Sequence, residues 1–69
     1  MFDQRKLQAQ MVLKGVKSEE LAEAIGIDTT TYYRRLKNEG NFSRKEMQTI
    51  IEFLGIENPQ EIFFAESDA

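Results

Sequence analysis

The stretch SEELAEAIGIDTTTYYRRL, residues 18–36, decides the fold. It contains two short helical segments joined by Gly26, Ile27 and Asp28. At helical spacing, the apolar residues of both segments fall on one face of each; they are Leu21, Ala22, Ile25, Tyr32 and Leu36. Gly26 suits a sharp turn because glycine adopts positive φ without steric cost, and Asp28 suits the N-cap of the second segment. The pattern therefore predicts two helices packed across a tight turn, with Ile27 filling the corner.

The second of these helices, expected over about residues 29–37, has an unusual composition. Three threonines and two tyrosines follow Asp28, and all of them rank below Ala, Leu or Glu in helix propensity. A helix of this kind depends on its cap and on neighbouring core rather than on propensity. Its outward side chains are then free to be selected for what they contact.

Three further helices complete the expected architecture. The first spans about residues 3–14, with Asp3 as its cap and Gly15 as its stop. Ser18 is expected to cap the second helix. A fourth helix is expected from the capping box of Ser43 and Glu46 to the stop at Gly55. A fifth is expected to begin at Asn58, with Pro59 at its first position. We therefore predict an all-α fold of five short helices, in one domain over residues 1–64, followed by a frayed acidic tail over 65–69.

The charge distribution along the chain is strongly asymmetric. Residues 1–45 hold all nine Lys and Arg and six of the twelve Asp and Glu, for a net charge of 9 − 6 = +3. Residues 46–69 hold the other six acidic residues and no basic one, for −6. The total of −3 thus conceals a basic part that could attract phosphates and an acidic end.

The composition also excludes several functional classes. The chain has no Cys and no His, which removes thiolate chemistry, the commonest metal ligand and the commonest acid–base group at neutral pH. The serines and carboxylates are explained by helix capping. No apolar run approaches the length of about 20 residues that a membrane span needs, and no signal peptide is visible. We expect a cytoplasmic protein that is not an enzyme and has no metal, no cofactor and no membrane partner.

Residues 18–36 resemble the helix-turn-helix of phage repressor and Cro-like regulators, which have the lambda-repressor-like fold. The segment FSRKEMQTIIEFLGIENPQEIFF, residues 42–64, resembles the fourth and fifth helices of small phage-encoded members. The resemblance covers almost the whole chain. It implies sequence-specific binding of double-stranded DNA by a phage- or prophage-type transcriptional regulator, with the helix over residues 29–37 in the major groove.

The resemblance also implies which residues contact DNA. Thr29 and Thr30 would meet bases near the start of the third helix, and Arg34 one turn later. Ser18 would bind a backbone phosphate through its hydroxyl and the helix N-terminus, with Lys17 beside it.

Helical phase supports part of this assignment without the family. With Tyr32 facing inward, Thr30, Arg34 and Lys37 lie on the opposite face, at 100° per residue. Further candidates for phosphate contact follow in the loop and at the start of the fourth helix; with Lys37 they are Asn38, Asn41, Arg44 and Lys45.

Two residues of the third helix are not assigned by this pattern. Tyr33 lies to one side, where it could contact a base, bind a phosphate or pack on the surface. Many relatives carry an aliphatic residue at the position of Arg35, whereas here Leu36 takes the buried role. The helix would then be slightly rotated relative to the family pattern.

The C-terminal end motivates an alternative function. Phe63 and Phe64 are neighbours, so a helix can bury only one of them, and the other is a candidate contact in a homodimer. The same acidic, aromatic end could instead make the protein an interaction module on this scaffold, such as an anti-repressor or an antitoxin-like partner.

Overall fold

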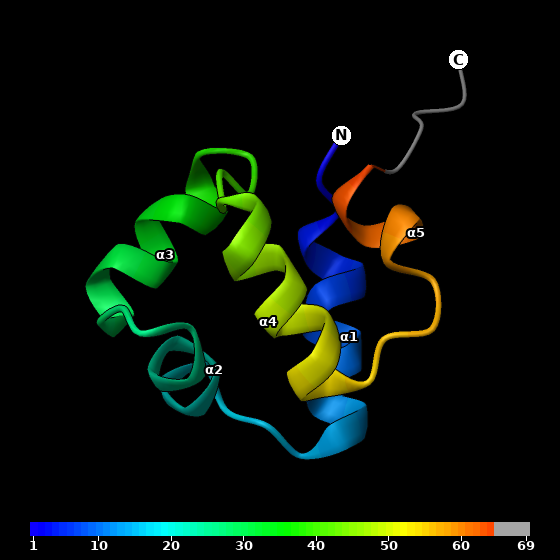
Figure 1. Cartoon of the computed structure of the whole chain (residues 1–69), viewed down its shortest axis with the longest axis horizontal. Helices are drawn as coiled ribbons and strands as arrows, with labels where there is room; N and C mark the ends of the chain where they lie inside the picture. The colour runs from blue at the N-terminus through cyan, green and yellow to red at the C-terminus, as the bar shows by residue number, and fades with distance from the viewer. Residues whose placement is uncertain (65–69) are drawn as a thin grey trace.

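The structure, a computed structural model, describes residues 1–64 and consists of α-helices in that range (Figure 1). The helices are α1 (Gln4–Lys14), α2 (Ser18–Ile25), α3 (Thr29–Lys37), α4 (Arg44–Leu54) and α5 (Pro59–Phe63). The prediction of an all-α fold with five helices is confirmed for this part of the chain. The predicted acidic tail, residues 65–69, lies outside the described residues.

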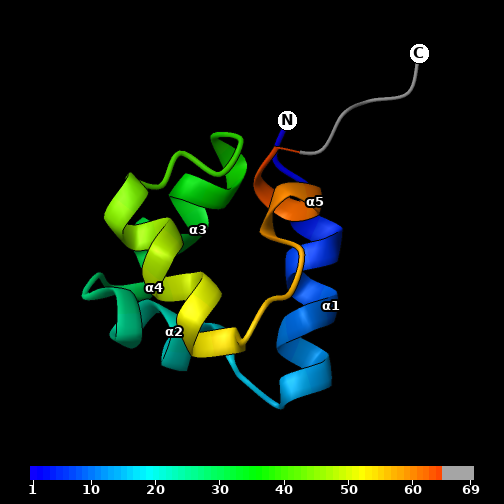
Figure 2. The ribbon, with the colours of Figure 1, turned by 45° about the vertical axis from the view of Figure 1, so that its right-hand side comes forward.

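Helix α4 is the centre of the molecule. Helices α2 and α3 lie on one side of it, and α1 and α5 lie together on the other (Figures 1 and 2). The N-terminal segment is tied to α5, since the Asp3 N–H donates to the Ile62 carbonyl at 2.6 Å. This arrangement leaves one long side of α3 facing away from the rest of the protein.

The core is built from residues of all five helices and their connections. Its buried apolar members are Leu7, Met11, Leu21, Ala22, Tyr32, Leu36, Phe42, Ile50, Leu54, Ile56, Ile62 and Phe63. Ile25 and Ile27, which we predicted to be core residues, are half-buried and pack against this cluster. Tyr32 is 1% exposed and donates its hydroxyl to the Met11 sulfur at 3.4 Å. Burial raises the pKa of Tyr32 to about 12.

The predicted cap of α2 is wrong by one residue. Ser18 is the first residue of the helix, and Lys17 occupies the N-cap position with extended backbone. The side chain of Glu20 accepts a hydrogen bond from the Lys17 N–H at 3.1 Å. Glu20 thus supplies the half of a capping box that binds the N-cap N–H.

The remaining caps and stops agree with the predictions. Asp3 and Asp28 cap α1 and α3, and Ser43 forms a capping box with Glu46 at α4. At the turn between α2 and α3, Gly26 has φ = +91° and the Ile27 N–H donates to the Ala22 carbonyl at 3.0 Å. The left-handed conformation at Gly26 ends α2, and α3 begins three residues later at Thr29. Within residues 1–64, no helix has both the length and the hydropathy of a membrane span.

Candidate nucleic-acid interface

The outward face of α3 carries the residues predicted to contact bases. Tyr32 and Leu36 are buried, and Thr30, Arg34 and Lys37 are exposed on the other side of the helix. Thr29, at the first position of the helix, is partly exposed. The phase predicted from the sequence, with Tyr32 inward and Thr30, Arg34 and Lys37 outward, is therefore the phase of the helix.

The start of α3 is fixed by Asp28. Its carboxylate accepts a hydrogen bond from the Thr31 N–H at 2.7 Å. Hydrogen bonds from Thr31 hold the pKa of Asp28 below its ordinary value of 3.8, so the cap is ionised at neutral pH. A negative charge at this position also complements the positive end of the helix dipole. The cap thus holds the N-terminal turn in which Thr29 and Thr30 lie.

Arg34 has a preferred direction along the helix. Its guanidinium donates to the Thr31 hydroxyl at 3.2 Å. Residues three apart are neighbours on a helix surface, so this spacing could have revealed the contact in the sequence. The contact turns Arg34 toward the N-terminal half of α3, where Thr30 lies.

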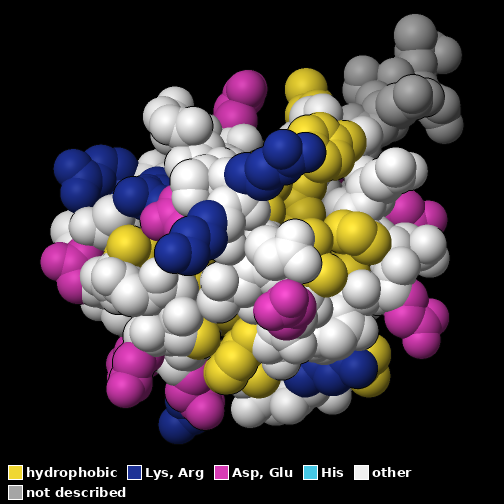
Figure 3. All heavy atoms as spheres, in the orientation of Figure 1, with side chains coloured by type: hydrophobic (Ala, Val, Ile, Leu, Met, Phe, Trp, Pro, Cys, Tyr) yellow, Lys and Arg dark blue, Asp and Glu magenta, His cyan; other side chains and the backbone are white. Residues whose placement is uncertain are grey.

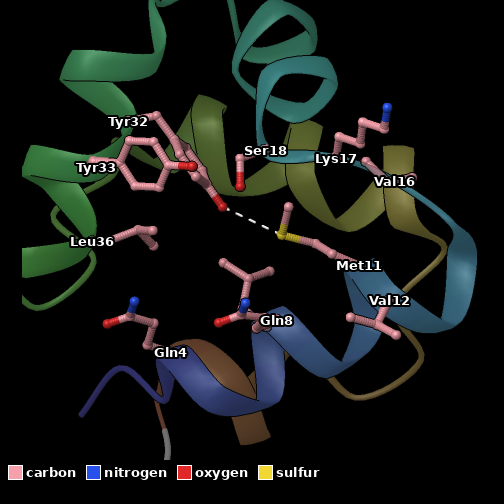
Figure 4. A pocket seen from close by; sticks show the side chains of 11 residues that line it. Gln4, Gln8, Met11, Val12, Val16, Lys17, Ser18, Tyr32, Tyr33 and Leu36 are labelled. Atoms are coloured by element: carbon pink, nitrogen blue, oxygen red, sulfur yellow. Dashed lines mark hydrogen bonds between the residues drawn. The ribbon is translucent and has the colours of Figure 1, made fainter.

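Tyr33 lies on the flank of α3 that faces α1 and α2. Its ring is half exposed and meets the ring of Tyr32 edge to face, at 5.6 Å between centroids. It lines a cavity together with Lys17 and Ser18 at the start of α2 (Figure 4). Tyr33 thus lines the same cavity as the predicted phosphate contacts at the start of α2.

The cavity beside Tyr33 has a volume of about 330 Å³, is open to solvent, and is lined by residues of α1, the start of α2 and α3. Its floor is apolar, with Leu7, Met11, Val16, Tyr32 and Leu36 among the lining residues. Its rim is polar, and the Ser18 hydroxyl points into it (Figure 4). Gln4 and Gln8 of α1 also line the cavity, and nothing in the sequence assigned them a role, because their position beside it depends on the packing of α1.

The other end of α3 carries the remaining predicted phosphate contacts. Asn38 and Asn41 are exposed in the loop, and Arg44 and Lys45 are exposed in the first turn of α4. On the face drawn in Figure 3, several Lys and Arg side chains lie over α3 and the start of α4, and acidic side chains are spread over the whole face. The basic excess predicted from the charge distribution is thus located beside the exposed face of α3.

Arg35, which no sequence pattern assigned, forms an ion pair with Glu46 of α4. Their side chains are 29% and 17% exposed, so the pair is largely shielded from solvent. Burial acts to raise the pKa of Glu46, but hydrogen bonds from the backbone of Ser43 and from Arg35 together outweigh it and hold this pKa below its ordinary value. The partners lie on different helices, so no helical spacing in the sequence could indicate the pair.

The C-terminal pair of phenylalanines divides as predicted. Phe63 is buried and Phe64 is 63% exposed. Phe64 borders an apolar groove of about 220 Å³ between α4 and α5, visible as a hydrophobic area in Figure 3. The groove is lined mainly by Met47, Ile51, Pro59, Phe63 and Phe64, with Arg44 at its edge.

Comparison with known proteins places the chain in a family. The family model described as helix-turn-helix matches residues 7–62, which is most of the chain and includes α2, the turn and α3. No curated protein matches the chain, and no solved structure does. With its helical structure and this match, the chain belongs to the helix-turn-helix family of DNA-binding transcriptional regulators and has the lambda-repressor-like fold.

Proposed function

We propose that the protein is a repressor or Cro-like regulator of the phage or prophage type, which reads the major groove with α3. The observation that carries this proposal is the exposed row of Thr30, Arg34 and Lys37, opposite the buried Tyr32 and Leu36. The protein would act in the cytoplasm by occupying an operator, without catalysis and without a cofactor.

The chemistry of the row fits base readout. A threonine methyl group matches the methyl group of thymine, and an arginine guanidinium matches the two acceptors of guanine. The hydrogen bond from Arg34 to Thr31 limits the directions that the guanidinium takes before binding. Because fewer rotamers are lost on docking, part of the entropic cost of the contact is already met in the free protein.

Two groups of side chains would hold the DNA backbone on either side of the groove. One is formed by Lys17 and Ser18 at the start of α2, with Tyr33 beside them. The other lies at the far end of α3 and consists of Lys37, Asn38, Asn41, Arg44 and Lys45. Such contacts fix the register of the protein on DNA and carry no sequence information themselves.

The protein would bind as a homodimer. Phe64 and the neighbouring apolar groove offer a surface that could pair with the same surface on a second copy, as a two-fold interface requires. A dimer of this kind would bind a pseudo-palindromic operator whose half-sites lie about one helical turn apart. A single domain makes few phosphate contacts, so the monomer should bind weakly and be sensitive to salt.

The test compares two variants on two kinds of duplex, one selected from a random pool and one of random sequence. Arg34→Ala should weaken binding to the selected duplex by about 1–3 kcal/mol and change random binding far less. Lys45→Ala should weaken binding to both duplexes alike, and should lower the slope of log K against log salt concentration by about one. Equal losses on both duplexes for Arg34→Ala would refute base readout by this residue.

A second candidate is a protein-interaction module that uses the acidic, aromatic C-terminal end. The exposed Phe64 beside an apolar groove favours it. A gel shift with random duplex at low salt separates the candidates, because the regulator should retard the duplex and the interaction module should not.

A further inference from the structure

We propose that Arg35 is a positioning residue that does not contact DNA, and that it fixes the loop over residues 38–43 and the start of α4 relative to α3. The proposal rests on the proposed function in one respect, because it takes that loop and the start of α4 to contact the DNA backbone. It assigns a role to the one charged residue of α3 that the base-reading face leaves out.

The side chain of Arg35 connects two helices. Its guanidinium lies in the last turns of α3 and pairs with the Glu46 carboxylate in the first turn of α4. The same carboxylate accepts a hydrogen bond from the Ser43 N–H at 2.8 Å, as part of the capping box that begins α4. Glu46 therefore joins the end of α3 to the residue at which α4 starts.

The backbone of Arg35 holds the other end of the same loop. Its carbonyl accepts hydrogen bonds from three N–H groups, those of Asn38 at 3.2 Å, Gly40 at 2.9 Å and Asn41 at 3.3 Å. The beginning of the loop is thus bound to the main chain of Arg35, and its end is linked to the Arg35 side chain through the Glu46 carboxylate. One residue of α3 organises the whole connection to α4.

This connection carries the proposed phosphate contacts at the far end of α3. Asn38 and Asn41 lie within the loop, and Arg44 and Lys45 follow Ser43 directly. If the ion pair is lost, these groups must be ordered when DNA binds, and the cost of ordering lowers the affinity. Arg35 itself contributes little attraction for phosphates, because its charge lies against the opposite charge of Glu46.

The deciding variant is Glu46→Gln, since its charge effect and its positioning effect have opposite signs. It changes the net charge from −3 to −2, so electrostatics alone predicts tighter binding to DNA. The glutamine oxygen can still accept the Ser43 N–H, whereas the ionic attraction to Arg35 is lost. We expect Glu46→Gln to bind both selected and random duplexes several-fold more weakly than the wild type.

The matched control is Glu57→Gln, which removes the same charge from the exposed connection between α4 and α5, away from the proposed DNA contacts, and leaves the ion pair intact. It should bind as tightly as the wild type or slightly more tightly. Arg35→Met, which keeps the aliphatic stem, should weaken binding as Glu46→Gln does, and the double variant should lose no more than either single one. Arg35→Lys, which keeps the charge, should recover part of the affinity.

All titrations are made at a temperature at which melting curves show every variant to be fully folded, so that a change in stability alone leaves affinity unchanged. Binding by Glu46→Gln that equals or exceeds the wild type would overturn the proposal, and so would additive losses in the double variant. Affinity for the random duplex does not depend on base readout, so the comparison of variants on that duplex tests the role of Arg35 separately from the role of Arg34. A wild type that binds random duplex without sequence preference would contradict the proposed function, and the comparison of variants would still test the role of Arg35.

Discussion

Gly40 offers the sharpest test of how the loop beside α3 is held in place. Its φ is +67°, and a Cβ added there would lie 2.6 Å from Cδ2 of Phe2 and closer still to two other ring atoms. Gly15 has nearly the same backbone, with φ = +69°, but a Cβ added there would meet nothing within 4 Å. Gly40→Ala and Gly15→Ala therefore share the backbone strain and differ in the contact with Phe2.

The expected losses of stability follow from that comparison. A left-handed alanine costs about 1–2 kcal/mol, and the lower entropy of the unfolded chain returns about 0.4–1 kcal/mol, so Gly15→Ala should cost about 1 kcal/mol. The half-buried Phe2 packs on Phe42 and Phe63, with ring centroids 6.2 and 5.9 Å away. Displacing that ring forfeits about half of the roughly 1.5–3 kcal/mol of a fully buried side chain. Gly40→Ala should thus cost about 2–2.5 kcal/mol in total.

Urea unfolding followed by circular dichroism measures both losses. In a Phe2→Ala background the ring is absent, so Gly40→Ala should cost only about 1 kcal/mol, the strain alone. Equal losses for Gly40→Ala and Gly15→Ala in the wild-type background would refute the reasoning. So would a Gly40→Ala loss that is unchanged by removing Phe2.

Three further predictions concern single residues. Burial raises the pKa of Tyr32 from 10.0 to about 12, so the stability that the neutral phenol contributes is complete below pH 10 and is lost as the pH rises toward 12. In chemical unfolding at high pH, Tyr32→Phe should remove this loss of stability. At neutral pH the same substitution should cost about 1 kcal/mol or less, because the hydroxyl bonds only to a thioether. The pKa of Asp28 is lowered in the folded protein, so its ionised cap stabilises the fold above about pH 3.8, and this stabilisation is lost as the pH falls through the lower pKa of the folded state. In thermal melts, Asp28→Asn should keep the cap and lose less stability in acid than the wild type. Asp28→Ala should be destabilised at neutral pH. Phe64→Ser should leave the fold intact, since the ring is 63% exposed, and should shift the dimer that we propose toward monomer in analytical ultracentrifugation; unchanged sedimentation would place the interface elsewhere.

Much of the fold could be predicted because its signals are local. Caps at Asp3, Asp28 and Ser43, and glycines at the ends of α1, α2 and α4, act within a few residues of themselves. The inward phase of α3 followed from Tyr32 and Leu36, four residues apart. The predicted cap at Ser18 is wrong by one residue because the preference for Ser at N-cap is a tendency, and here Lys17 holds that position with Glu20 bound to its N–H.

The parts of the site that escaped prediction depend on packing between helices. Arg35 meets Glu46 across the loop that joins α3 to α4, and Gln4 and Gln8 line the same cavity as Lys17 only because of where α1 packs in the fold. The position of Phe2 over Gly40 likewise joins segments that are far apart in the chain. Contacts of this kind leave no periodic signal in the sequence, so the structure is needed to find them.

Selection of bound duplexes from a random pool, made in parallel with the wild type and with Arg34→Ala, tests the central claim most directly. The account predicts that the wild type enriches a motif with two half-sites about one helical turn apart. It predicts that Arg34→Ala enriches the same motif with one guanine position per half-site no longer specified. A wild type that enriches no motif would contradict sequence-specific recognition by this protein, and identical motifs from both proteins would contradict base readout by Arg34.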